Sequence, residues 1–393
     1  MNHILKLAHE LQNDLANFLS DLVRIPSVSG DERAVIQRIK QETARIGYDK
    51  VYIDSYGNLL GRIGEGRRVI VFDGHCDIVD VGNPDMWNRD PFSGAIENGM
   101  LYGRGSCDQK GGLASAIYAA KILKKIGVPE DVTVWVIASI QEEDLEGAAW
   151  HYILHEDNLL PETVVITEPT NLNIYRGHRG RIEIKVETSG VSCHGSAPER
   201  GVNAIYKMSP IIQEIKELND RLAFDDFLGK GTVTISDIRS SSPSLCAVAD
   251  QCVVHLDRRL TIGETIFVCL NEIEQLPSVK KAKAEVYVNR YEKISYTGME
   301  YPMDAYCPSW VLPKDHPLLD YTISCYQNLF GCDPDVGKWT FSTNGVGTMG
   351  TRGIPTVGFG PGNEIYAHAP NEFIPIEHLV KACAFYAEFV RKY

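Results

Sequence analysis

The sequence predicts an α/β protein with a mostly parallel sheet, helices on both of its faces, and an inserted ferredoxin-like β-α-β-β-α-β domain. Apolar strands and helices alternate up to about residue 177, which is typical of a parallel sheet. The run VTVWVIASI at 132–140 is apolar on both faces, as in a strand that is covered on both sides. From 179 to about 289 the order becomes β-α-β-β-α-β, which is typical of the split ferredoxin-like unit.

In the first part of the chain, leucines recur with helical spacing between Leu5 and Leu22, so an N-terminal helix is expected. The strands that follow are predicted at 51–54, 58–63, 68–74, 132–140 and 164–167, with a helix at 112–126. After a Pro- and Tyr-rich connection at 291–317, the α/β pattern resumes. We expect a helix at 318–330, a strand at 356–359 and a final helix at 376–392.

The inserted part has its own set of elements. We expect strands at 181–188, 232–238, 249–260 and 283–289, and helices at 201–222 and 264–276. The 393 residues suit two domains. We therefore expect one domain from residues 1–177 and 293–393, and a second from residues 178–292.

Composition narrows the class of function. The 39 basic and 52 acidic residues give a net charge of −13, which argues against nucleic acid as a partner. We also expect no membrane partner, because no run of about 18 apolar residues occurs. The N-terminus lacks a continuous apolar core of the signal-peptide type. The ten cysteines are scattered and form no CxxC pair, so a cytoplasmic enzyme with free thiols is expected.

Ionisable side chains follow the ends of several predicted strands. In open α/β sheets the binding site lies beyond the carboxyl ends of the strands, so these side chains are candidates for one common site. A further histidine lies in a loop before the last helix. In chain order the candidates are His75 with Asp77, Asp108, the pair Glu142 and Glu143, Glu168, and His368.

Each candidate has an ordinary structural explanation when it is taken alone. A histidine after a strand is commonly structural, adjacent glutamates are commonly solvated, and an aspartate before a helix is commonly an N-cap. Together they supply two imidazoles and several carboxylates, a donor set that suits two divalent cations. Zn²⁺ is favoured, with Co²⁺ and Mn²⁺ as alternatives. Asp77 is placed to accept the proton on the second ring nitrogen of His75.

Longer motifs around these residues carry a resemblance to a known family. The stretches GHCDIVDVGNPDMWNRDPF and NGMLYGRGSCDQKGG, followed by QEED, TEP and AHAPNE, resemble the dinuclear zinc aminoacylase-like metallopeptidases. This family includes acetylornithine deacetylase, succinyl-diaminopimelate desuccinylase, carboxypeptidase G and related dipeptidases. Within it the chain is most similar to bacterial hydrolases linked to selenium metabolism. The resemblance covers nearly the whole chain.

The resemblance implies a role for each candidate. Asp108 would bridge both metals, with His75 and Glu168 completing one site and Glu143 and His368 the other. Glu142 would be the general base, with Asp77 supporting the catalytic site. The family also implies a cis peptide bond between Asp108 and Gln109.

The inserted domain carries two more matching segments. SCHGSAPERGVNA resembles the family segment that supplies His194 and Asn203, and DRRLTIGET the one that supplies Arg259. The resemblance implies that His194 assists the scissile carbonyl, commonly in a partner subunit, and that Arg259 and Asn203 hold a substrate carboxylate. It also implies that this domain is a lid and a homodimerisation surface. The alternatives are a surface charge for Arg259 and a structural histidine at position 194.

These inferences predict a metal-dependent amidohydrolase or peptidase. Its substrate would be a small N-acyl amino acid or a dipeptide-like molecule that carries a carboxylate. Glu168 favours amide cleavage over ureido cleavage, because the related N-carbamoyl hydrolases carry histidine there. A dipeptidase, an N-carbamoyl amino acid hydrolase and an inactive metal-dependent binding protein remain as alternatives.

Three further features concern the chemistry of the site. Cys76, Cys107 and Cys193 flank site residues, but neighbours along an extended chain point to opposite faces, which disfavours a thiolate nucleophile. The GFGPG run at 358–362 resembles a substrate-binding loop, and the GK[ST] of a phosphate loop is absent from it. Many family members carry an aspartate where this chain has Asn344, which leaves the shape and charge of the leaving-group pocket open.

Overall fold

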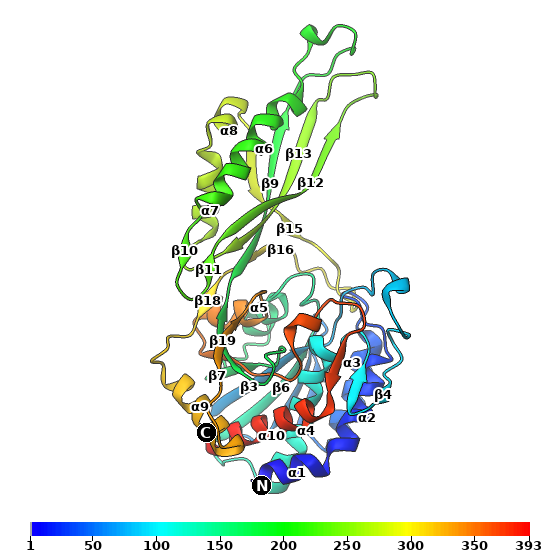
Figure 1. Cartoon of the computed structure of the whole chain (residues 1–393), viewed down its shortest axis with the longest axis vertical. Helices are drawn as coiled ribbons and strands as arrows, with labels where there is room; N and C mark the ends of the chain where they lie inside the picture. The colour runs from blue at the N-terminus through cyan, green and yellow to red at the C-terminus, as the bar shows by residue number, and fades with distance from the viewer. Residues whose placement is uncertain (1) are drawn as a thin grey trace.

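The computed structural model describes residues 2–393 and shows an elongated molecule with two lobes (Figure 1). Both chain termini lie in the lower lobe. The chain enters the upper lobe along β9 (Gly180–Ser189) and returns through short strands that include β15 (Arg290–Tyr291), β16 (Met303–Asp304) and β17 (Tyr306–Cys307). The upper lobe is called the inserted domain below, and the lower lobe the main domain.

The main domain is built on a nine-stranded sheet. Its four central strands, in the order β6-β3-β7-β20, are parallel, as the sequence predicts. The flanks differ, because β1, β2, β8 and β18 are attached by antiparallel pairing and β19 runs parallel to β8. Short connections explain the antiparallel β1–β2 pair, since parallel neighbours need a long crossover. The strands are β1 (Lys50–Ile53), β2 (Leu59–Ile63), β3 (Arg68–His75), β6 (Val132–Ser139), β7 (Thr163–Ile166), β8 (Ile174–His178), β18 (Trp310–Val311), β19 (Val336–Trp339) and β20 (Thr356–Gly358).

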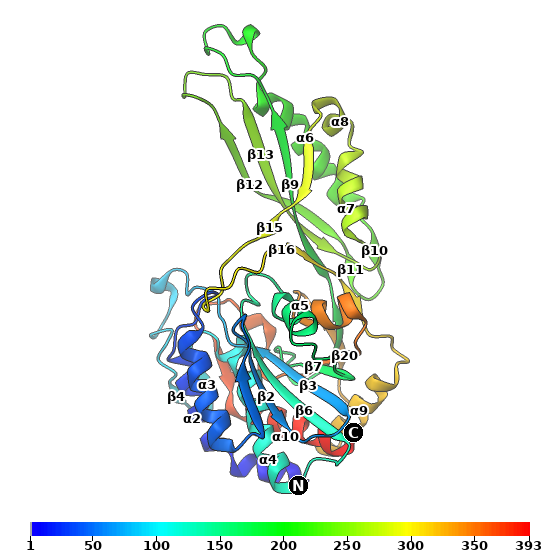
Figure 2. The same ribbon diagram turned by 180° about the vertical axis from the view of Figure 1, so that it is seen from behind.

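Helices bury the central strands on both sides, and every residue of β6 is buried. Helices α4 and α10 pack against each other behind the sheet when the molecule is seen from the back (Figure 2). Phe385 of α10 stacks on Phe359 with ring centroids 3.8 Å apart. The predicted N-terminal helix is two helices, because the chain breaks at Leu11. The helices are α1 (His3–Glu10), α2 (Gln12–Val23), α3 (Arg33–Ile46), α4 (Gly111–Ile126), α5 (Ala148–His155), α9 (Pro317–Phe330) and α10 (Ile376–Lys392). A small sheet joins β4 (Ile96–Glu97), β5 (Met100–Tyr102) and β21 (Phe373–Pro375).

The inserted domain is an antiparallel sheet with helices on one face (Figure 1). Its order is β12-β13-β9-β14, so the first strand lies between the third and the fourth, as in ferredoxin-like folds. Alternate residues of β9 and β13 are buried, which gives the domain a second hydrophobic core beneath its helices. The elements are β12 (Thr232–Ser241), β13 (Gln251–Leu260), β14 (Glu285–Val288), α6 (Ala204–Asp220), α7 (Ile266–Glu274) and α8 (Pro277–Ala282), with a hairpin of β10 (Phe224–Asp225) and β11 (Gly229–Lys230). The predicted fold class is confirmed.

Two further expectations concern the whole chain. All ten cysteines are free thiols, as the scattered spacing predicts. Within residues 2–393 no helix combines the length and the apolar character needed to cross a membrane.

Candidate metal centre

The strand-end candidates converge at one edge of the main sheet. Strands β6, β3, β7 and β20 are parallel neighbours, so the segments that follow them emerge at the same edge. His75 ends β3, Glu142 and Glu143 follow β6, and Glu168 follows β7. Asp108 lies in the turn before α4, and His368 lies in the loop between β20 and β21.

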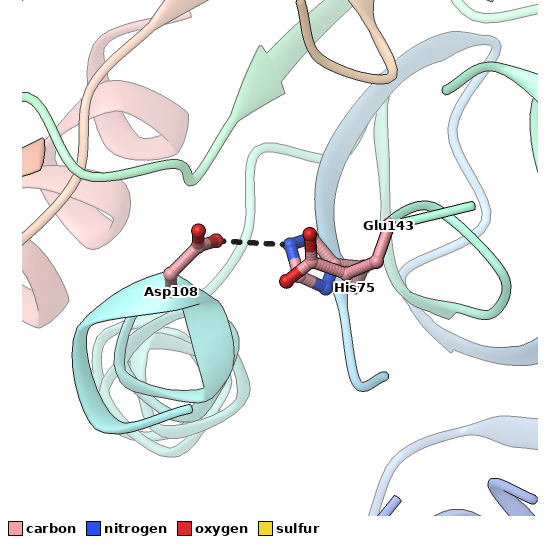
Figure 3. A group of neighbouring side chains, drawn as sticks. All are labelled: His75, Asp108 and Glu143. Carbon is pink, nitrogen blue, oxygen red and sulfur yellow. Dashed lines mark hydrogen bonds and ion pairs between the residues drawn. The ribbon is translucent and has the colours of Figure 1, made fainter. Parts of the chain in front are cut away.

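The first cluster of side chains surrounds His75, which Figure 3 shows facing the Asp108 carboxylate with Glu143 beside it. Its Nε2 lies 3.2 Å from Asp108 Oδ1, 3.5 Å from Glu168 Oε1 and 3.8 Å from Glu142 Oε2. His75, Glu142 and Glu168 are buried, so these groups meet away from bulk water.

The second cluster surrounds His368. Its Nε2 lies 2.8 Å from Glu143 Oε2 and 3.4 Å from Asp108 Oδ2. Asp108 therefore points one carboxylate oxygen at each histidine, which is the arrangement expected of a bridging ligand. The peptide bond between Asp108 and Gln109 is cis, as the resemblance implies.

The pKa values of the clustered groups are shifted by burial and by their neighbours' charges. Burial and the Asp108 charge raise the pKa of Glu168 to about 8 and that of Glu143 to about 7. Burial likewise raises the pKa of Glu142 well above its usual range. Hydrogen bonds to Asp108 and Glu143 raise the pKa of His368 to about 10. Several buried carboxylates at this spacing repel one another unless a proton or a cation lies between them.

The residues present fit a pair of divalent cations. Glu142 Oε1 and Glu168 Oε2 are buried and have no hydrogen-bond partner within residues 2–393. Buried carboxylate oxygens of this kind are normally paired or bound to metal. The nearest acceptor for His75 Nδ1 is the Asp77 carbonyl oxygen at 2.9 Å, which directs the lone pair of Nε2 toward the carboxylates.

The sequence comparisons agree with this geometry. A model of peptidase family M20/M25/M40 matches residues 71–392, a span that contains every residue of the two clusters. The chain belongs to this family. The family predicted from the sequence motifs is therefore confirmed, and the chain has the scaffold of an M20 metallopeptidase with a candidate His/Asp/Glu metal site.

Individual M20 relatives match over nearly the full length. The uncharacterized protein YgeY of Escherichia coli strain K12 is 51% identical over 98% of this chain and 95% of its own. Aminopeptidase PepT of Bacillus cereus superposes with a TM-score of 0.72 at 20% identity, covering 97% of this chain and 98% of its own. The YXEP protein of Bacillus subtilis, described as a dinuclear metal binding peptidase from the M20 family, gives a TM-score of 0.69 at 15% identity, covering 98% of each chain.

Asp77 contacts two candidate residues of this M20 site, although its carboxylate contact with His75 differs from the predicted one. Its carboxylate Oδ1 lies 3.5 Å from His75 Nδ1, farther than its own carbonyl oxygen. Asp77 Oδ2 instead accepts from Ser29 Oγ at 2.7 Å and from the Glu143 N–H at 3.1 Å. Asp77 thus fixes the backbone beside Glu143 as well as the ring of His75.

Two residues that hold the ligands in place were missed at the level of sequence. Glu372 accepts hydrogen bonds from the backbone N–H groups of Gly105, Cys107 and Asp108, and it pairs with Arg104 at 2.8 Å. Gln109 donates to Glu168 from its amide nitrogen. Glu372 is the last residue of the AHAPNE motif, so the motif itself contained the signal.

Asn344 holds three segments of the main domain together. The side chain of Asn344 is buried and donates to Asp73 Oδ2 and Ser139 Oγ, each at 2.9 Å. Its Oδ1 accepts from the Gly147 N–H at 2.9 Å. Asn344 therefore ties together the ends of β3 and β6 and the start of α5.

The GFGPG segment packs closely against the site. A Cβ atom at Gly360 would lie 2.1 Å from the Glu168 carbonyl oxygen, which no side chain can tolerate. Because residue 360 is a glycine, the loop can pass directly against the backbone of Thr167 and Glu168, which follow β7.

The three candidates in the inserted domain do not join the clusters. Asn203 caps α6 by accepting from the Ile205 and Tyr206 N–H groups. His194 lies in the β9–α6 segment, at the end of the inserted domain farthest from the main domain (Figure 1). Arg259 pairs with Asp257, with Nε 2.9 Å from Oδ1, near the base of the sheet. Arg259 lies opposite Arg181 at the start of β9, where the chain enters the inserted domain.

Proposed function

We propose that this M20 protein is a two-metal hydrolase that cleaves the amide bond of a small N-acyl amino acid or dipeptide-like substrate. The observation that carries the proposal is Asp108, whose two carboxylate oxygens face His75 and His368 separately. His75 with Glu168, and His368 with Glu143, would complete the two sites. Zn²⁺ suits the nitrogen and oxygen donor set, with Co²⁺ or Mn²⁺ as alternatives.

The chain's own residues would divide the chemistry between them. When bound, the two cations would polarise the scissile carbonyl and acidify the attacking water. Glu142 is buried beside the clusters and would take a proton from that water and deliver it to the leaving amine. Burial raises the pKa of Glu142, which suits a group that must hold the proton between the two steps.

The inserted domain would supply substrate contacts, and we propose residues 178–292 as this lid. Arg259 would bind the substrate carboxylate, because a guanidinium fork matches a carboxylate in geometry and charge. We retain Asn203 as a candidate for the same carboxylate, although its side chain oxygen is engaged as a helix cap. Closure of the lid would exclude water from the amide bond.

His194 belongs to the segment between β9 and α6, which lies at the end of the inserted domain away from the main domain (Figure 1). We propose that it acts in the site of a second copy, within a homodimer formed through the inserted domain. Exposed Val191, Val202 and Tyr206 around it are consistent with a surface that another molecule covers.

A substrate panel tests the proposal. Metal-free protein would be reloaded with Zn²⁺, Co²⁺ or Mn²⁺ and assayed for amine release from N-acyl amino acids, dipeptides and N-carbamoyl amino acids. We expect metal-dependent turnover of N-acyl amino acids or dipeptides. Dominant turnover of N-carbamoyl substrates would overturn the argument from Glu168. Ligand binding without turnover of any substrate would favour a binding protein instead.

A further inference from the structure

The loop Ile140–Gly147 carries both Glu142 and Glu143, yet it has little regular structure of its own. It joins β6 to α5, and one internal backbone hydrogen bond spans it, from Leu145 N–H to Gln141 O at 3.2 Å. Its shape must therefore come from contacts with neighbouring segments. Three side chains of the main domain accept hydrogen bonds from the loop backbone. Glu32 accepts from the Gln141 N–H and Asp77 from the Glu143 N–H. Asn344 accepts from the Gly147 N–H.

The far half of this loop is held by the strands that connect the two domains. Arg181, the second residue of β9, places one guanidinium nitrogen 2.7 Å from Glu146 Oε2 and 3.1 Å from the Asp144 carbonyl oxygen. Cys307 in β17 lies directly across from Arg181 in the sheet and places its Sγ 3.2 Å from the same Glu146 oxygen. Glu146 thus contacts the outgoing strand and the returning strand at one point.

Glu146 is also fixed to the main domain. Its other oxygen accepts from Ser342 Oγ at 2.7 Å. Only 12% of the Glu146 side chain and 15% of the Arg181 side chain are exposed, so the pair is shielded from water on both sides. A shielded, hydrogen-bonded ion pair of this kind holds its geometry, and removing one partner is strongly unfavourable.

A second, more exposed contact also joins the connection between the domains to this loop. Lys293, two residues beyond β15, places its Nζ 2.5 Å from Asp144 Oδ2. Both passages of the chain between the domains therefore contact the segment that directly follows Glu142 and Glu143. Any rotation of the inserted domain about these strands would move that segment.

We propose that Arg181 and Glu146 are positioning residues, whose ion pair couples the angle of the inserted domain to the placement of Glu142 and Glu143. The inference rests on the proposed function for its kinetic meaning. Neither residue needs to touch the substrate. The pair instead keeps the proposed base and the neighbouring ligand in register while the lid opens and closes.

The test replaces Arg181 with glutamine and with lysine, and compares both variants with Arg176→Gln. Arg176 is a matched control, because it also lies near the connection and contacts the inserted domain, with its guanidinium 3.7 Å above the Phe227 ring. Within residues 2–393 no hydrogen bond or ion pair joins Arg176 to loop Ile140–Gly147, and its guanidinium donates to the Leu312 carbonyl oxygen. Metal content, kcat and KM would be measured separately for each protein.

We expect Arg181→Gln to retain about two metals per chain, to lose about 10- to 100-fold in kcat, and to change KM by less than about 3-fold. Arg181→Lys should recover most of kcat, and Arg176→Gln should match wild type. A rise in KM without a fall in kcat would make Arg181 a substrate-binding residue and overturn the proposal. Loss of metal or of the fold along with kcat would overturn it as well.

A second readout needs no substrate. Hydrogen exchange measured on peptides covering residues 140–148 should speed up in Arg181→Gln and remain unchanged in Arg176→Gln. If the wild type turns over none of the amides, the proposed function fails while this comparison still decides the coupling. Unchanged exchange in Arg181→Gln would show that the loop is held without the ion pair, and the inference would be wrong.

Discussion

The candidate residues of the main domain and those of the inserted domain differ in how far one folded chain brings them together. Six side chains from five segments of the main domain meet at one sheet edge, each within 3.8 Å of another member of the group. The three from the inserted domain remain apart, and each is occupied by a local partner or is solvent-facing.

The two sets of residues are proposed for different roles, metal binding and substrate binding, which have different geometric requirements. A metal site needs several ligands fixed at short distances, and parallel strands that end at one edge provide that without any movement. Substrate contacts on a lid must be absent when the substrate enters and present when it reacts. The proposed metal ligands thus meet in one conformation, while the proposed substrate contacts would depend on closure or on a second copy.

The largest effect should follow a change at the point shared by both clusters. Asp108→Asn removes the charge that faces both histidines, so we expect metal content to fall below one per chain and kcat/KM to fall more than about a thousand-fold. Elemental analysis and turnover measure both effects. Asp85→Asn is a matched control, because Asp85 is exposed in the same connection between β3 and α4. Retention of two metals by Asp108→Asn would contradict a bridging role.

The next test asks whether the inserted domain acts across subunits. His194→Ala should keep its metals and lose about 10²- to 10³-fold in kcat, as expected when a group that stabilises an oxyanion is removed. Mixing it with inactive Glu142→Ala should restore about a quarter of wild-type activity, since half the dimers are mixed and each has one intact site. A mixture as inactive as its components, or a monomer in sedimentation, would contradict the second-copy role.

A smaller effect is expected at the base of the lid. Arg259→Gln should raise KM about 10- to 100-fold with little change in kcat, since a charge-assisted hydrogen bond contributes about 1.5–3 kcal/mol. Arg239→Gln provides the control, because Arg239 is exposed on β12 and its guanidinium pairs with the nearby Asp237. An unchanged KM for Arg259→Gln would identify this side chain as a surface charge.

The smallest effect should follow removal of a thiol next to a candidate. Cys193→Ser, beside His194, should keep kcat/KM within about 2-fold of wild type, because its sulfur hydrogen-bonds to the backbone oxygens of His194 and Ala197. If Cys193→Ser lost most of its activity, a thiolate nucleophile would again be a candidate mechanism.

Much of the fold and the ligand set can be predicted from sequence because both leave local patterns. Apolar runs mark β3, β6 and β7, and the ionisable residues follow directly at their ends. The flanking strands β8, β18 and β19 were not predicted, because β18 has only two residues and the other two, IYRGH and VGKW, contain glycine and basic residues in place of an apolar run. The break at Leu11 is likewise decided by how two helices fit against α10 and α4.

The supporting residues are harder to find from sequence for a related reason. Glu372 is 264 positions from the Asp108 backbone that it holds, and Asn344 is 271 positions from Asp73. Arg181 and Glu146 are ordinary charged residues until the fold places them between two domains. Their roles depend on tertiary contacts, whereas the ligands are constrained by the chemistry of the metal as well.

The most direct test of the central claim compares wild type with Glu142→Gln. Both proteins would be analysed for metal content and for amine release from the preferred substrate. The two-metal account predicts about two metals per chain in both proteins and a loss of about 10²- to 10⁴-fold in kcat in the variant alone. One metal or none in the wild type, or undiminished turnover by Glu142→Gln, would contradict it.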